Sequence, residues 1–313
     1  MKHYSATPGR IEKKIMRKCP DRYPNISTGL RLAIADPGAL LKGWEQGDDN
    51  MDWMDVNGAS LRYELSGDGA DTVLLVHELG GALDSWDPVM SALQKDFRVL
   101  RYDQRGFGQS EKARGTLSVD AMTGDMVGLL DELGLDAPCH VAGIALGAGI
   151  AIRFAAQYPG RVKSLFAASP ATGVKEERRQ ALLARAAAVE ESGMRPIAET
   201  SLKASYPDIL RARGGQARFE AYRRQWLTND PFGFAAINRM LGDMDMTGDY
   251  AKVACPALVV AGQHDGLRPP EAIKAMADAM PNSTYILADT GHFMHVQTPE
   301  MFLDLATPFM KGV

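Results

Sequence analysis

From residue 51 onward the chain shows regular patterns of apolar and polar residues. Residues 52–56 and 60–66 alternate between apolar and polar side chains and flank the dipeptide Asn57-Gly58. Alternation with a period of two is typical of a strand with one buried face, and Asn-Gly between two such strands favours a tight hairpin turn. The pattern therefore predicts a β-hairpin at the start of the ordered fold.

Short apolar runs then alternate with segments of helical period. Runs that are apolar throughout are typical of strands buried on both faces of a sheet, whereas apolar residues every three or four positions indicate amphipathic helices. Strands and helices in alternation predict right-handed crossovers and a mostly parallel sheet with helices on both faces, the α/β class. The predicted strands are 72–77, 97–102, 139–144, 162–168, 257–261 and 284–287, and the predicted helices are 85–93, 118–133, one that ends at 158, 270–280 and 299–310.

The alternation stops between residues 174 and 246, where Arg, Ala, Met and Leu dominate and the whole stretch is predicted to be helical. A helical insertion between the fourth and fifth parallel strands would form a cap. We therefore expect a core made of residues 51–173 and 247–313, with the cap at 174–246. Residues 1–50 show no clear period, and we interpret them as an N-terminal extension that wraps the core or contributes to the interface of a homo-oligomer.

Composition excludes several classes of function. The net charge of −4 gives no electrostatic reason to expect nucleic-acid binding. No apolar run approaches membrane-spanning length, and the first residues lack the apolar segment of a signal peptide. The three cysteines are odd in number and far apart, which argues against a disulfide framework or a zinc site and fits a reducing compartment. We expect a cytoplasmic protein that binds a small molecule, with no metal and no organic cofactor.

The segment that says most about chemistry is 137–159. An apolar run at 139–144 leads into Gly-Ile-Ala-Leu-Gly at 143–147, and a helical stretch of small residues follows. Strand, sharp turn and helix in this order are the context of a nucleophile elbow, Gly-x-Ser-x-Gly. Its glycines let the strand and the helix approach closely around a residue in a strained conformation. Here that central residue is Ala145, which has no oxygen with which to attack a carbonyl carbon.

The order of five such segments resembles the α/β-hydrolase superfamily, from residue 51 to the C-terminus. The resemblance implies the α/β-hydrolase fold and places Ala145 where the serine nucleophile belongs. It makes Asp265 the acid and His292 the general base. It also implies an oxyanion hole formed by the backbone N–H groups of Leu79 and Leu146. Besides the elbow, the segments that carry the resemblance are 77–81, 103–110, 262–265 and 290–293.

Within the superfamily, the segments 101–106, 229–235 and 243–245 are similar to 3-oxoadipate enol-lactonases and related small esterases. This similarity implies a small ester, enol-lactone or related acyl substrate under the cap, and it leaves the bond type open among ester, lactone, thioester, amide and C–C. Arginines of the cap could help to bind a carboxylate on such a substrate, although we expect most of them to face solvent. They are Arg178, Arg179, Arg211, Arg213, Arg223 and Arg224.

Other residues of these loops have structural alternatives. Asp265 could be a turn residue, since Asp is common in turns, but the loop after strand 162–168 offers no rival carboxylate. Glu78 stands where the superfamily usually has Gly, so either its backbone tolerates a side chain or its carboxylate faces the pocket and constrains the charge of the substrate. Trp86 could line the pocket floor or pack in the core. We treat both Glu78 and Trp86 as candidate substrate-binding residues.

Two more residue assignments concern structure rather than chemistry. We expect Asp103 and Arg105 to pair and shape their loop. We expect His295 to be a solvated or packing histidine rather than the base.

Ala145 leaves three interpretations open. Acyl transfer needs His292 to take a proton from a hydroxyl group while Asp265 fixes the tautomer of the imidazole. Loss of the serine costs a serine hydrolase on the order of 10⁶ in turnover. The chain is therefore a serine hydrolase inactivated by an engineered alanine, a natural non-hydrolytic binding protein, or a lyase or C–C bond enzyme that uses His292 as a base without a nucleophile. The retained acid, base and elbow glycines favour the first interpretation.

Overall fold

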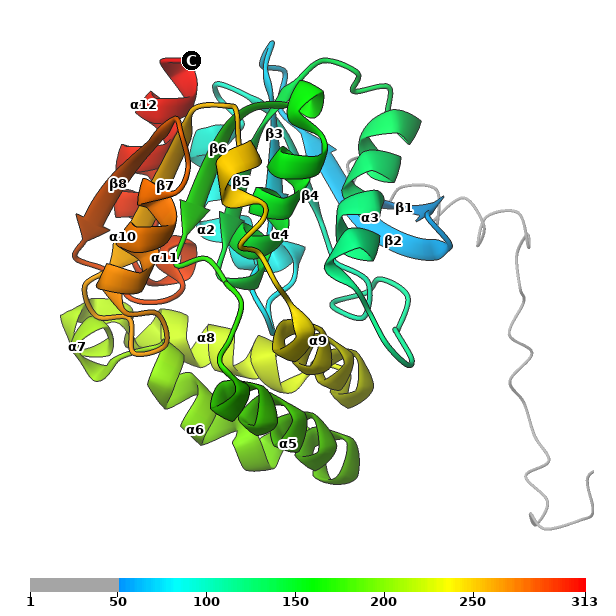
Figure 1. Ribbon diagram of the computed structural model, residues 1–313, viewed down its shortest axis with the longest axis vertical. Coiled ribbons are helices and arrows are strands. Elements are labelled where there is room, and N and C mark those ends of the chain that lie inside the picture. The colour runs from blue at the N-terminus through cyan, green and yellow to red at the C-terminus, as the bar shows by residue number, and fades with distance from the viewer. Residues whose placement is uncertain (1–50) are drawn as a thin grey trace, which may run out of the picture. The chain divides into compact units, whose positions relative to one another are not determined.

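The computed structural model describes residues 51–313, so the interpretation of residues 1–50 lies outside the described residues. The described chain forms an eight-stranded sheet in the order β1-β2-β4-β3-β5-β6-β7-β8 (Figure 1). The predicted strands are all present, with ends shifted by one residue at most, and the predicted α/β-hydrolase fold is confirmed. The strands are β1 Met51–Val56, β2 Ala59–Ser66, β3 Thr72–Val76, β4 Arg98–Tyr102, β5 Cys139–Ile144, β6 Val162–Ala168, β7 Ala257–Gly262 and β8 Ser283–Ala288.

The predicted hairpin forms one edge of this sheet. Asn57 and Gly58 both have positive φ, 49° and 74°, as a two-residue turn that matches the twist of the strands requires. β2 also pairs antiparallel with β4, with Tyr63 opposite Tyr102. All other neighbouring strands of the sheet are parallel, so their carboxyl ends meet at one edge.

Helices cover both faces of the sheet. α3 and α4 lie with α10 on one face, and α2 and α12 pack together on the other (Figure 1). A short helix after β8, α11, was not predicted. No helix within residues 51–313 is both long and apolar enough to cross a lipid bilayer. The helices of the core are α2 Asp87–Leu93, α3 Val119–Glu132, α4 Leu146–Gln157, α10 Pro270–Asp278, α11 Met294–Gln297 and α12 Pro299–Lys311.

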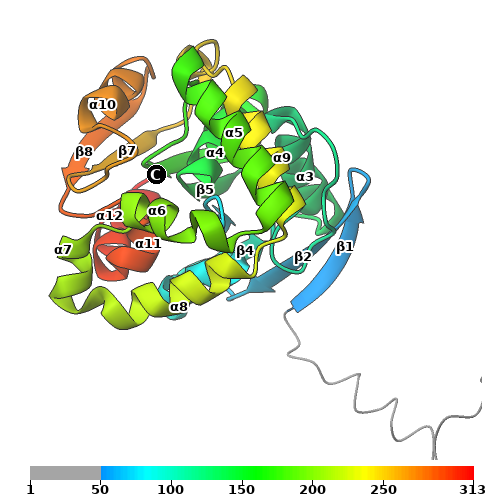
Figure 2. The same cartoon turned by 90° about the horizontal axis from the view of Figure 1, so that it is seen from below.

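Five α-helices separate β6 from β7, and all five lie within the stretch 174–246. They gather beyond the carboxyl ends of the parallel strands, where α5 and α9 run side by side (Figure 1 and Figure 2). Because the loops at this edge hold the candidate catalytic residues, the cap helices lie over the candidate site. They are α5 Glu176–Ser192, α6 Arg195–Ser205, α7 Asp208–Leu210, α8 Gln216–Leu227 and α9 Pro231–Asp243.

Candidate active site

Ala145 occupies the sharp turn between β5 and α4. Its backbone has φ 52° and ψ −111°, a conformation that residues with a side chain rarely adopt. Hydrogen bonds hold this conformation from both sides. The N–H of Ala145 donates to the carbonyl oxygen of Ala168 at 2.9 Å, and its own carbonyl oxygen accepts from the N–H groups of Gly149 and Ala171 at 3.1 and 2.8 Å. The backbone therefore has the shape of a nucleophile elbow although the side chain is a methyl group.

The two elbow glycines are required by close backbone approaches. A Cβ atom on Gly147 would lie 2.1 Å from the carbonyl oxygen of Val76 in the neighbouring strand, and one on Gly143 would lie 2.5 Å from the carbonyl oxygen of Gly147. No side chain fits at either distance. The first turn of α4 therefore rests directly against the ends of β3 and β5.

Asp265 and His292 lie together although they come from different loops. Nδ1 of His292 donates to Oδ2 of Asp265 at 2.8 Å, and this contact orients the imidazole so that Nε2 is the nitrogen available for a base. The second carboxylate oxygen accepts from the N–H groups of Leu267 and Arg268 at 2.8 and 3.1 Å. Burial raises the pKa of Asp265, but the contacts with His292, Ser169 and the N–H of Leu267 together outweigh burial, so the pKa lies below its usual value and the group stays ionised.

The candidate oxyanion donors border the same cavity as Ala145 and His292. Leu146 is the first residue of α4, where backbone N–H groups have no partner within the helix and favour negative charge. Leu79 follows a segment that His77 fixes. Nδ1 of His77 donates to the carbonyl oxygen of Glu78 at 2.8 Å, and Nε2 accepts from the N–H of Gln104 at 3.0 Å. Burial lowers the pKa of His77, which keeps this ring neutral.

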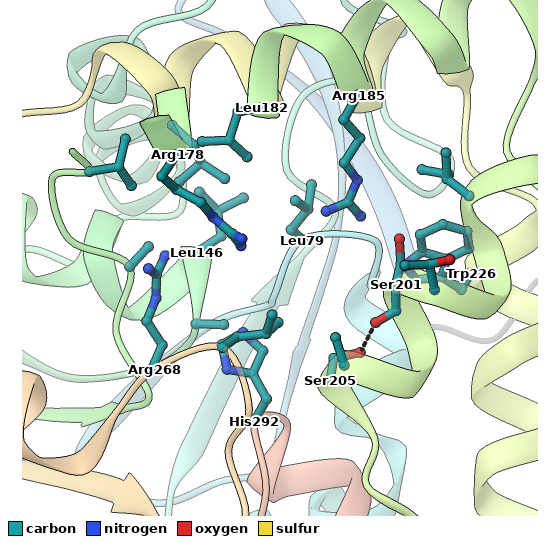
Figure 3. Close-up of a pocket in the computed structure, with 18 of the residues that line it drawn as sticks. Leu79, Leu146, Arg178, Leu182, Arg185, Ser201, Ser205, Trp226, Arg268 and His292 are labelled. Carbon is teal, nitrogen blue, oxygen red and sulfur yellow. Dashed lines mark hydrogen bonds between the residues drawn. The ribbon is translucent and has the colours of Figure 1, made fainter. Parts of the chain in front are cut away.

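A cavity of about 490 Å³ lies between the core loops and the cap, a volume suited to a small molecule (Figure 3). Most of its lining is apolar. From the core it is lined by Leu79, Ala145, Leu146, Ala171, Val174, Leu267, Arg268, His292 and Phe293, and from the cap by Arg178, Leu182, Ala184, Arg185, Ala188, Pro196, Ile197, Thr200, Ser201, Ala204, Ser205, Trp226 and Leu241.

The hydroxyl group of Ser205, in the cap, is one of those that line the cavity. Oγ of Ser205 donates to the carbonyl oxygen of Ser201 at 2.9 Å, one helical turn earlier (Figure 3). Its proton is therefore committed to the backbone of α6. Position 145 offers no hydroxyl group from which His292 could take a proton.

Glu78 and Trp86, predicted as substrate-binding residues, are not among the residues that line the cavity. Both are fully buried beneath the loop after β3. Oε1 of Glu78 accepts from Oγ of Ser85 at 3.0 Å, and Oε2 lies 3.0 Å from Nε2 of His295. Burial opposes the charge of Glu78, yet His295 and His77 lower its pKa to about 2. The ring of Trp86 lies against that of His295, tilted by 46° with centroids 4.4 Å apart, so in this structure both residues pack around that histidine.

The predicted pair of Asp103 and Arg105 is wrong. Arg105 instead binds Asp125 of α3, with Nε at 2.7 Å from Oδ2. Asp103 is fully buried, where it accepts from the N–H of Leu83 at 2.7 Å and lies 3.4 Å from a guanidinium nitrogen of Arg62. Each residue therefore fixes a different part of the fold.

Among the cap arginines noted in the sequence, Arg178 lines the cavity. Arg179 pairs with Asp243 and Arg213 with Asp289, both away from it. The structure adds Arg185 and Arg268, which were not predicted as site residues. Arg185 follows Arg178 by seven residues on α5, a spacing that returns to the same helix face after two turns. That spacing was the available signal for Arg185, whereas Arg268 follows the predicted acid by three residues.

No group of three or more His, Cys, Asp or Glu side chains between residues 51 and 313 could hold a metal ion. Cys139 and Cys255 are free thiols, and burial raises their pKa values to about 12 and about 11.

The elbow, the Asp–His pair and the cavity at one edge of a mostly parallel sheet define an α/β-hydrolase. Residues 68–300 match the family described as serine aminopeptidase, S33, and the chain belongs to that family.

Individual relatives are similar over nearly their whole length. "Putative carbamate hydrolase RutD" of Caulobacter sp. (strain K31) is 31% identical over 260 residues, which are 80% of this chain and 96% of that protein. 3-Oxoadipate enol-lactonase 1 of Acinetobacter baylyi is 25% identical over 258 residues, 82% of this chain and 95% of the enzyme. Among solved structures, the enol-lactonase of Burkholderia xenovorans LB400 superposes with a TM-score of 0.79 at 27% identity, covering 83% of this chain and 100% of that one. A malate-bound thermophilic esterase of Thermogutta terrifontis gives 0.79 at 28% identity, with 83% and 98% covered.

Proposed function

We propose that this chain has the active site of a serine hydrolase for a small ester, enol-lactone, carbamate or related acyl compound, and that Ala145 removes its covalent step. The observation that carries the proposal is the position of Ala145. It is held in the elbow conformation and lines one cavity with His292, whose imidazole is oriented by Asp265. The names of the similar proteins, an enol-lactonase, an esterase and a carbamate hydrolase, support an acyl substrate.

The proposed reaction follows from the roles of the residues. With serine at position 145, Nε2 of His292 would take the hydroxyl proton while the oxygen attacks the carbonyl carbon. The carbonyl oxygen, now negatively charged, would accept hydrogen bonds from the N–H groups of Leu79 and Leu146. His292 would then return the proton to the leaving group, and water would release the acid. With Ala145 the site keeps substrate binding and carbonyl polarisation but forms no acyl-enzyme.

Installing the nucleophile tests this proposal. Ala145→Ser is compared with the chain as it is on a short-chain nitrophenyl ester, an enol-lactone and a carbamate. Since loss of a catalytic serine costs on the order of 10⁶ in turnover, we expect a gain of several orders of magnitude on at least one substrate.

The control adds a second change to the serine variant. His292→Ala should abolish the gain, and Asp265→Asn should reduce turnover by about 10⁴. If the serine variant is silent on these substrates and on thioester, amide and C–C substrates, the chain is instead a binding protein with a hydrolase fold. Equal turnover with and without His292 would contradict the assigned base.

A further inference from the structure

We propose that the ligand of this cavity is an acyl compound that carries two acid groups, held by Arg178, Arg185 and Arg268. The proposal rests on the proposed function, because it places the carbonyl group of that compound beside Ala145. It assigns a class of substrate that the fold alone does not define.

The first argument is that these arginines make no direct ion pair with the described residues. Within residues 51–313, none of the three forms an ion pair with a carboxylate. Nε of Arg185 and Nε of Arg268 are buried without a hydrogen-bond partner, although Arg185 lies over the ring of Phe234 at 5.0 Å. A buried donor without a partner is unfavourable, and a guanidinium group offers five N–H donors. The cavity therefore presents donors that a ligand can satisfy.

Two arginines elsewhere in the fold do bind carboxylates, unlike the three in the cavity. Buried Arg101 binds Glu64, with Nη2 at 2.6 Å from Oε2. Half-buried Arg239 binds Glu190 through two parallel hydrogen bonds of 2.8 and 2.6 Å. These two arginines thus have carboxylate partners, whereas no carboxylate pairs with the three described arginines in the cavity.

Electrostatics strengthens the argument. Burial, with a further contribution from Arg178, lowers the pKa of Arg185 to about 10, and the same two causes lower the pKa of Arg268. Both groups remain positively charged at neutral pH, so three like charges share one cavity. The nearby carboxylate of Asp265 has its oxygens engaged by His292 and by backbone N–H groups. An anion in the cavity would relieve this repulsion.

The arrangement favours two acid groups over one. Arg178 and Arg185 leave α5 seven residues apart, about 10 Å along the helix axis, and Figure 3 shows them as separate side chains on the cavity wall. A carboxylate matches the planar fork of an arginine, and one carboxylate cannot satisfy guanidinium groups on both sides. The mostly apolar lining of the cavity suits the carbon chain that would join the two acid groups. Its acyl carbonyl would then face Leu79 and Leu146.

Binding to the chain as it is tests the number of acid groups, because Ala145 leaves an ester intact. Calorimetry measures the affinity for three methyl esters that differ in their number of free carboxylates. The monomethyl ester of propane-1,2,3-tricarboxylic acid has two, monomethyl glutarate has one, and dimethyl glutarate has none. We expect each added carboxylate to tighten binding about tenfold or more, as charge-assisted hydrogen bonds do. Equal affinity for the compounds with one and two carboxylates would overturn the proposal. So would inorganic phosphate competing as well as the compound with two carboxylates.

Matched variants test the residues. Arg185→Gln and Arg268→Gln should each weaken binding of the compound with two carboxylates about 10- to 100-fold and leave dimethyl glutarate unchanged. The control is Arg179→Gln, on the same helix but paired with Asp243 outside the cavity, and it should change neither. Circular dichroism shows that each variant folds. A loss of equal size in the control would contradict the assignment.

Failure of this proposal is distinguishable from failure of the proposed function. If Ala145→Ser hydrolyses methyl esters but prefers dimethyl glutarate, the hydrolase assignment stands and the proposal that the substrate carries two acid groups is wrong. If the serine variant is silent and the stepwise gain in affinity persists, the acid groups stand and the hydrolase assignment fails.

Discussion

At the scale of single residues, Ala145 shows that its surroundings determine the elbow. A side chain at positive φ costs about 1–3 kcal/mol, and the methyl group of Ala145 makes no hydrogen bond that could offset this cost. The conformation persists because the backbone of Ala145 is bonded to Ala168, Gly149 and Ala171. We infer that a serine placed here would inherit the same backbone shape.

The strain predicts an unusual result for Ala145→Gly. Glycine adopts positive φ freely, so relief of strain should outweigh the greater entropy of the unfolded chain, and the variant should gain about 1 kcal/mol of stability. For a domain of this size that corresponds to a rise in Tm of about 2–4 °C, measured by calorimetry. The control, Ala148→Gly in the interior of α4, should lose about 1 kcal/mol. Equal losses in both variants would show that position 145 is not strained.

The sequence was informative about some site residues and silent about others. Asp265 and His292 each follow a strand, and parallel strands bring such loops to one edge, so their proximity could be predicted. The arginines of the cavity could not be singled out in this way. α5 carries charged residues around most of its surface, so its pattern places Arg178 and Arg185 on one helix face but does not say that this face meets the core. Glu78 and Trp86 pack beneath the loop because His295, distant in sequence, lies there.

At the scale of elements, strands buried on both faces were the most predictable part of the fold. β5 and β7 are buried at every residue, and such continuous apolar runs have clear ends. The hairpin was also predictable from Asn57-Gly58, but its pairing with β4 was not. That pairing depends on which edge of the sheet remains free, and this is a property of the assembled sheet. The four-residue helix α11 is too short to show a period.

The contact between α4 and β3 predicts a strong effect of Gly147→Ala. The added Cβ atom would meet the carbonyl oxygen of Val76 at 2.1 Å, and backbone atoms of a central strand cannot move aside cheaply. We expect a loss of about 3 kcal/mol or more in urea unfolding. The control is Gly160→Ala, where no atom lies within 4 Å of the new Cβ, and it should change stability by less than about 0.5 kcal/mol. Similar small losses in both would contradict the close approach.

At the scale of the whole molecule, the loop at 78–81 connects the core with the cap. Nδ2 of Asn229 donates to the carbonyl oxygen of Gly80 at 2.8 Å, and a Cβ atom on Gly80 would lie 2.5 Å from the ring of Trp226 in α8. From below, Glu78 holds this loop against His295. Because Leu79 lies between these two attachments, the same contacts that join cap and core also position a candidate oxyanion donor.

The buried pair of Glu78 and His295 makes the stability of this junction depend on pH. The folded-state pKa of Glu78 is about 2, below its ordinary value of 4.5, so the folded state favours the ionised form. Its contribution is therefore fully present above pH 4.5 and is lost as the pH falls from 4.5 toward 2. Asp265, whose pKa is also lowered, adds a loss of the same sign.

Glu78→Gln tests this dependence through urea unfolding at pH 7 and at pH 3. The variant removes the buried carboxylate that contacts Ser85 and His295, so we expect a loss of about 1–3 kcal/mol at pH 7. It should also lose less stability than the parent chain between pH 7 and pH 3, because the titrating group is gone while Asp265 remains. Exposed Glu132→Gln, at the end of α3, is the control and should follow the parent at both pH values. A variant whose loss between pH 7 and pH 3 equals that of the parent would show that Glu78 is not ionised in the folded protein.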